Sequence, residues 1–68
     1  MLWLITENES VIVNECNLHE QGNKWEVWVR RYNGTSLKIK QSKEKEDVAL
    51  IKEAIDYAIE NNVKALRL

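Results

Sequence analysis

The segment from Lys24 to Lys40, KWEVWVRRYNGTSLKIK, constrains this chain most, because it predicts a β-hairpin and also which side chains share a face. Asn33-Gly34 is a strong hairpin turn signal. A two-residue loop would place Val29 opposite Lys38 and leave neither face apolar. A three-residue loop over Tyr32–Gly34 gives one apolar face and puts the glycine at a left-handed position, which glycine adopts at least cost. The cross-strand pairs expected are Arg31 with Thr35, Val29 with Leu37, Val27 with Ile39, and Trp25 with Gln41.

The opposite face of this hairpin is predicted to be aromatic and basic. Residues 24–40 contain five basic residues and one acid, whereas residues 1–23 contain four glutamates and no Lys or Arg, and the whole chain has a net charge of −1. Any attraction for a polyanion is therefore expected to be local to the hairpin. The residues predicted to bind a partner are Trp28, Arg30, Tyr32, Lys38 and Lys40, on a face that also carries Glu26 and Ser36.

The tryptophans divide between the two faces of the predicted sheet. Trp25 belongs to the apolar face and is expected in the core, while the place of Trp3 is left open because Leu2 and Leu4 compete with it for the inside. Trp28 has two interpretations. It either forms a structural cation–π pair with a lysine across the hairpin, or it is a stacking platform or binding hot spot.

The remaining sequence predicts an α+β fold made of one domain, residues 1–68, in the order β-β-β-β-α. A four-stranded antiparallel meander is covered on one face by the helix. The last six residues, VKALRL, are compatible with a short fifth strand at the sheet edge or with an arm laid on another protomer. The elements before and after the hairpin are strands over Met1–Ile5 and Ser10–Cys16, a loop over Asn17–Asn23, and a helix that begins after Ser42 as its N-cap and ends at a left-handed Asn61-Asn62.

The predicted helix has one apolar stripe and a second, smaller apolar strip beside it. The main stripe is expected to cover the sheet. The second strip makes the apolar face of the helix wider than a small sheet needs. A core this small also usually requires extra support, so we expect a homo-oligomer, with a dimer favoured. The stripe consists of Val48, Ile51, Ile55, Ala58, Ile59 and Asn62, and the candidate oligomer contacts are Leu50, Ala54, Tyr57, Leu66 and Leu68.

The sequence predicts neither catalytic residues nor a cofactor or metal site. Cys16 and His19 form at best half of a zinc site, since a structural site needs four ligands, and they lack an orienting group as a nucleophile–base pair. Gly22 and Gly34 are too few for a phosphate-binding loop. We therefore expect a protein that is not an enzyme. The short apolar opening MLWLI predicts neither a signal peptide nor a membrane span, and with a lone thiol it favours the reducing cytoplasm.

The order of motifs resembles a loose group of short, uncharacterised bacterial and phage proteins. Members of that group open with a Met-x-Trp strand and a Val-Asn turn region, followed by an aromatic-x-Val-x-Val hairpin and a Ser or Thr cap before one amphipathic helix. The matching positions are Met1-Leu2-Trp3, Val13-Asn14, the run from Trp25 to Val29, Asn33-Gly34, and Ser42. The resemblance implies a mobile-element accessory protein that acts by binding a host or defence component. It transfers no site residues.

Three functions remain open at this point. The first is a non-enzymatic module that binds a protein of acidic or mixed charge through the outer hairpin face. The second is a nucleotide or single-stranded nucleic-acid binder that stacks bases on Trp28 or Tyr32, a reading that the overall acidity disfavours. The third is a purely structural homo-oligomer in which the same face is the subunit interface.

Overall fold

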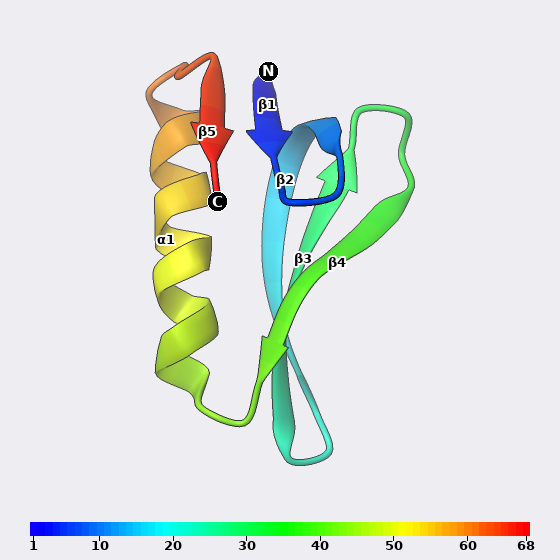
Figure 1. Cartoon of the computed structure of the whole chain (residues 1–68), viewed down its shortest axis with the longest axis vertical. Helices are drawn as coiled ribbons and strands as arrows, with labels where there is room; N and C mark the ends of the chain where they lie inside the picture. The colour runs from blue at the N-terminus through cyan, green and yellow to red at the C-terminus, as the bar shows by residue number, and fades with distance from the viewer.

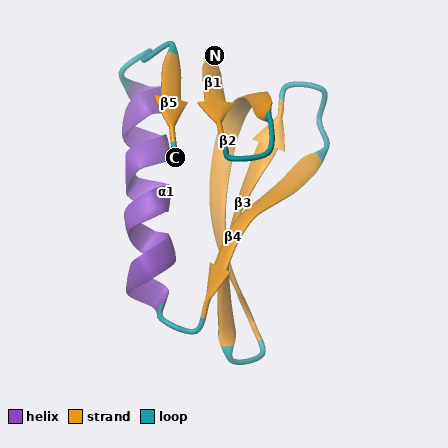
Figure 2. Ribbon diagram, in the orientation of Figure 1, coloured by secondary structure: helices purple, strands orange, loops and turns teal.

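The computed structural model describes all residues from 1 to 68 as one sheet with a helix beside it (Figures 1 and 2). The sheet order is β4-β3-β2-β1-β5, and α1 packs on one face. This confirms the predicted α+β class, and the open question about the tail is resolved by a fifth strand. The elements are β1 (Leu2–Ile5), β2 (Ser10–Gln21), β3 (Lys24–Arg31), β4 (Ser36–Ser42), α1 (Lys45–Glu60) and β5 (Ala65–Arg67).

The core lies between α1 and the inner face of the sheet, which we define as the face toward the helix. In β1, Leu2 and Leu4 are fully buried while Trp3 points outward and is 47% exposed, as the period-two alternation of a strand requires. Trp25 is half-buried against the core. The ten buried apolar residues are Leu2, Leu4, Val11, Val13, Cys16, Val27, Val29, Val48, Ile55 and Ala58.

Strand β2 is longer than the sequence indicated, so the prediction of a loop over Asn17–Asn23 is wrong. It continues to Gln21, pairs with β3 from Val13 onward, and ends in a two-residue turn in which Gly22 has a φ of 64°. Its outer residues are polar because that face is solvated, and strand propensity depends on such context. A β-bulge between Val13 and Glu15 reverses the alternation, which brings Cys16 inward although the earlier inward residues are odd-numbered.

The loop between β3 and β4 has the predicted three-residue form. Arg31 N–H donates to the Thr35 carbonyl at 2.7 Å, and Gly34 N–H donates to the Arg31 carbonyl at 2.9 Å. Gly34 has a φ of 94°. Val29 lies opposite Leu37, as predicted. The register near the loop therefore follows from the apolar pattern.

Farther from the loop the predicted register is wrong by one residue, because β4 has a bulge at Ile39. Val27 lies opposite Lys40 rather than Ile39, and Trp25 lies opposite Ser42 rather than Gln41. Ile39 still packs on the core. The bulge has one consequence for function: it turns the residues after Ile39 over to the other face.

Helix α1 begins two residues later than predicted, and the residues that it buries belong to the predicted apolar stripe. Glu44 is the N-cap, and Ser42, the last residue of β4, instead accepts a hydrogen bond from Glu44 N–H at 3.1 Å and donates one to Asp47 at 3.0 Å. Ser42 is held in the sheet ladder opposite Trp25, so the chain needs two further residues to turn into the helix. The helix ends at Glu60 with Asn61 as its C-cap, and Asn62 has a φ of 54°, which confirms the left-handed exit. Helix α1 is not long and apolar enough to cross a membrane.

The C-terminal strand β5 runs parallel to β1 at the edge of the sheet (Figure 1). Leu66 lies opposite Leu4 and is half-buried against the core, and Leu68 N–H donates to the Ile5 carbonyl at 2.9 Å. The tail is therefore an edge strand of its own chain. Helix α1 packs on one face of the sheet and leaves the opposite face open.

Candidate binding surface on the outer face of the sheet

The outer face, which we define as the sheet face away from α1, is built mainly by β2 and β3. The register pairs Glu15 with Arg30, Asn17 with Trp28, and His19 with Glu26 across these strands. All of these side chains lie on one face, because alternate residues of paired strands point the same way.

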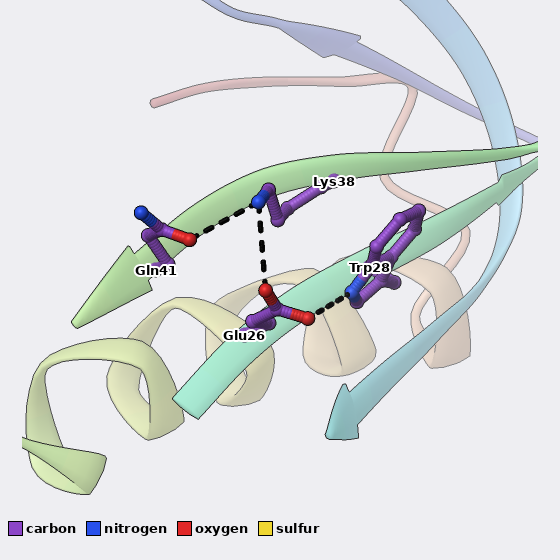
Figure 3. A network of polar contacts seen from close by, with 4 residues as sticks. All are labelled: Glu26, Trp28, Lys38 and Gln41. Carbon is purple, nitrogen blue, oxygen red and sulfur yellow. Dashed lines mark hydrogen bonds and ion pairs between the residues drawn. The ribbon is translucent and has the colours of Figure 1, made fainter. Parts of the chain in front are cut away.

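Glu26 is the centre of a polar network on this face (Figure 3). Its carboxylate accepts a hydrogen bond from the indole Nε1–H of Trp28 at 3.0 Å and lies 3.4 Å from the ammonium nitrogen of Lys38. Lys38 also donates to the amide oxygen of Gln41 at 3.0 Å. The Glu26 residue is only 7% exposed, so these partners replace water around its charge. Figure 3 shows the four side chains on the side of the sheet away from the helix.

The network also stabilises the ionised form of Glu26. The hydrogen bond from Trp28 is the main reason that the pKa of this carboxyl lies below its usual value, and the charge of Lys38 acts in the same direction. Partial burial opposes both effects. Glu26 is therefore an anion at neutral pH and an acceptor that fixes the indole ring.

The predicted cation–π pair between Trp28 and Lys38 does not describe the observed contact. The two residues do face each other across the hairpin, but the ammonium group lies against Glu26, and the Trp28 ring meets the edge of His19 at a centroid distance of 6.4 Å. The cation–π contact of this chain instead joins Lys45 to the ring of Trp25, at 4.8 Å.

The outer face is less basic than the sequence indicated. Arg30 forms an ion pair with Glu15 at 3.3 Å, so both hairpin cations on this face, Arg30 and Lys38, lie beside carboxylates of the same chain. Lys40 is placed on the other face by the bulge in β4, opposite Val27, so its predicted position on the outer face is wrong. The outer face is therefore a mosaic of paired charges.

Lys40 borders a different feature, a groove of about 390 Å³ between β4 and the loop that joins β1 to β2. Its apolar lining comes from Leu37, Ile39, Ile51 and Leu68. Residues of β4 and of the segment after β5 line the same groove, although these strands form opposite edges of the sheet. The sheet is therefore curled around the helix.

A row of apolar side chains crosses the outer face at the end of β3, beyond the pair of Glu15 and Arg30. Trp3 lies opposite Ile12, and Tyr32 N–H donates to the Ile12 carbonyl at 2.9 Å. Tyr32 is 60% exposed and Trp3 is 47% exposed. We call these three residues the aromatic row. Tyr32 is a predicted contact, whereas the sequence argument left Trp3 unassigned and gave Ile12 no role. The buried Leu2 and Leu4 on either side of Trp3 are the signal that places it outside.

A shallow hollow lies beside the aromatic row, over Trp28. Its lining includes Asn17, His19, Glu26, Trp28 and Arg30. Trp28 is half-buried at its base. The outer face thus has an apolar part, the aromatic row, and a recessed polar part, the hollow.

Cys16 and His19 lie on opposite faces of β2 and do not act together. The thiol of Cys16 is in the core, and burial raises its pKa to about 11. His19 is on the exposed outer face, opposite Glu26. At neutral pH the buried thiol is therefore protonated.

The candidate oligomer contacts on the helix lie on its solvent side. Leu50 is 67% exposed, Tyr57 is 65% exposed, and Ala54 is exposed between them. Of the two candidates in the tail, Leu66 packs on the core, and Leu68 is 44% exposed. No family model, curated protein or solved structure matches this chain. Its function is therefore inferred from these surfaces.

Proposed function

We propose that this chain is a small non-enzymatic binding module that contacts a protein partner through the outer face of its sheet. One observation supports this most: Tyr32 is 60% exposed on the same face as the indole of Trp28, which a hydrogen bond to Glu26 holds in place. Aromatic residues of this kind are frequent anchors of protein interfaces. The helix lies on the other side of the sheet from these side chains (Figure 3).

The fixed indole of Trp28 favours binding because its side-chain conformational entropy is already lost before a partner binds. Trp28 is tied to Glu26, and Glu26 is tied to Lys38 on the neighbouring strand. A side chain that is already immobilised loses little rotamer entropy on association, where a free one costs about 0.5–1.5 kcal/mol. The surface is therefore preorganised.

The charges favour a protein of mixed charge over a nucleic acid. A polyanion would need Arg30 and Lys38, and each lies within 3.4 Å of a carboxylate oxygen. Binding phosphate would compete with these ion pairs, whereas a protein surface with charges of both signs can add to them. The nucleic-acid alternative predicts a salt-dependent quenching of tryptophan emission by oligonucleotides at low ionic strength. An unchanged emission spectrum excludes it.

The non-enzymatic assignment is supported by what the reactive groups do. Glu26 is an acceptor for Trp28 and Lys38, and the Cys16 thiol is buried with a raised pKa. Both groups therefore serve the fold. We place the module in the cytoplasm and, on the resemblance to short bacterial and phage proteins, among the accessory proteins of mobile elements.

Affinity capture with two matched double variants tests this function. Arg30→Ala/Tyr32→Ala removes one ion-paired cation and one exposed tyrosine from the outer face. Lys52→Ala/Tyr57→Ala removes the same two kinds of group from the helix, where Lys52 pairs with Asp56 and Tyr57 is 65% exposed. We expect proteins captured by the wild-type chain to be lost with the first variant and kept with the second. Equal capture by all three chains would show that the outer face is not the binding surface.

A further inference from the structure

We propose that the partner on the outer face is a second copy of this chain, in a two-fold symmetric dimer that packs sheet against sheet. This inference rests on the proposed function and names the partner of the same surface. In a two-fold interface the same patch occurs on both sides and must be complementary to itself. The shape and charge of the outer face are compatible with self-complementarity, and its size is sufficient for a dimer interface.

The size of the outer face matches what a stable dimer buries. The molecule measures 33 × 21 × 20 Å, and the long axis runs along the sheet and the helix (Figure 1). A face bounded by the long axis and one short axis has a projected area of roughly 650 Å², at the lower end of the about 600–1,000 Å² that each partner contributes to a standard interface. The outer face is therefore large enough without help from the helix.

The outer face combines exposed aromatic side chains with a hollow. In the aromatic row Trp3 and Tyr32 are exposed and Ile12 is half-buried, and the hollow over Trp28 begins at the neighbouring residues Glu15 and Arg30. A two-fold axis between row and hollow seats Tyr32 of each copy in the hollow of the other. The phenol ring then meets the half-buried indole of Trp28, and its hydroxyl group reaches polar lining atoms.

The charges favour the outer face, and not the solvent side of the helix, as the surface of self-association. Outer-face charges are paired within each copy, Glu15 with Arg30 and Glu26 with Lys38, so two outer faces meet without net repulsion. The solvent side of α1 instead carries the exposed acids Glu46, Glu53 and Glu60 at intervals of seven residues, interleaved with Leu50 and Tyr57. None of these three acids forms an ion pair. Pairing this helix face with its own copy would juxtapose like charges at two-turn intervals.

The need for a partner follows from the size of the core. The chain buries 11 of its 68 residues, and its core has only one layer, between the inner face and α1. Domains of this length have little stability from a single core and commonly gain more by oligomerisation. A second copy packed against the outer face would supply this additional stability.

The two tyrosines of this chain give a matched test, because they have nearly the same exposure on opposite sides of the molecule. We would measure the dimer dissociation constant by sedimentation equilibrium for the wild type, Tyr32→Glu and Tyr57→Glu. A charge in the buried hollow should weaken the dimer by at least about 30-fold, as the loss of a hot-spot residue does. The Tyr57→Glu variant should dimerise like the wild type. Circular dichroism confirms that both variants are folded.

The remaining outcomes overturn this inference and distinguish it from the proposed function. A chain that stays monomeric at about 100 µM, or a dimer that Tyr57→Glu disrupts and Tyr32→Glu does not, excludes the sheet-to-sheet dimer. If the chain is monomeric and the Arg30→Ala/Tyr32→Ala variant still loses captured proteins, the binding function stands with a different partner. If capture is also unaffected by that variant, the outer face binds neither.

Discussion

The loop that sets the faces of the hairpin can be tested at Gly34. This residue has a φ of 94°, in the region that L-amino acids avoid. A Cβ added there meets no atom within 4 Å, so substitution introduces backbone strain and no clash. The sign of the effect therefore depends on chirality alone. We compare Gly34→Ala with the same position carrying D-alanine, which synthesis makes accessible in a chain of 68 residues.

The magnitude follows from two opposing terms. A left-handed conformation destabilises an L-residue by about 1–2 kcal/mol. Replacing glycine also lowers the conformational entropy of the unfolded chain, which stabilises the fold by about 0.4–1 kcal/mol. We expect Gly34→Ala to lower the free energy of unfolding by about 1 kcal/mol. D-alanine has no such strain and should raise this free energy by about 0.4–1 kcal/mol. The register should be preserved in both, because a slip would expose the fully buried Val27 and Val29.

Urea unfolding followed by tryptophan emission measures both effects, and thermal unfolding provides a check. For a domain of this size, 1 kcal/mol corresponds to a change in Tm of about 4–8 °C. The two alanine enantiomers should move the midpoint in opposite directions. If L-alanine and D-alanine are equally stable, Gly34 is not left-handed in solution and the three-residue loop is incorrect.

Three further predictions concern the titratable and aromatic groups. The folded-state pKa of Glu26 is lowered, so its contribution to stability is complete above the unfolded pKa and is lost as pH falls through the folded one. We expect the urea midpoint to fall on acidification below about pH 4, and the fall to be shallower in Trp28→Phe, which lacks the indole donor; an identical slope in both chains contradicts this assignment. Cys16, with a pKa of about 11, should react with a thiol reagent at pH 8 at least roughly 100-fold more slowly in the folded chain than in urea, and equal rates would place it at the surface. Lys45→Gln removes the cation over Trp25 and should cost about 0.5–1 kcal/mol in the same unfolding assay, whereas no change would mean that the contact is not formed in solution.

Much of the candidate surface could be predicted because it depends on local patterns. The three-residue loop and the apolar alternation place Trp28, Arg30 and Tyr32 on one face, and the structure has them there in the predicted register. Lys40 could not be placed correctly. Its position depends on the bulge at Ile39, which no turn residue or glycine in β4 announces.

The charge of the surface could also not be predicted from the sequence. Five basic residues in the hairpin predicted a basic face, but Arg30 is neutralised by Glu15 of β2 and Lys38 by Glu26. The first of these pairs joins strands whose register includes a second bulge, between Val13 and Glu15. Counting charges along a segment cannot reveal which of them meet across strands.

The sequence by itself determined the class of fold, the position of the helix and the reversal at Tyr32–Gly34. These features follow from periods of two and 3.6 residues and from the freedom of glycine at positive φ, which are properties of neighbouring residues. Only the tertiary structure decided that β2 extends to Gln21, that the tail is a strand beside β1, and that Glu26 is buried under Trp28 and Lys38. These features depend on contacts between segments far apart in the chain, where a one-residue bulge exchanges the two faces of a strand.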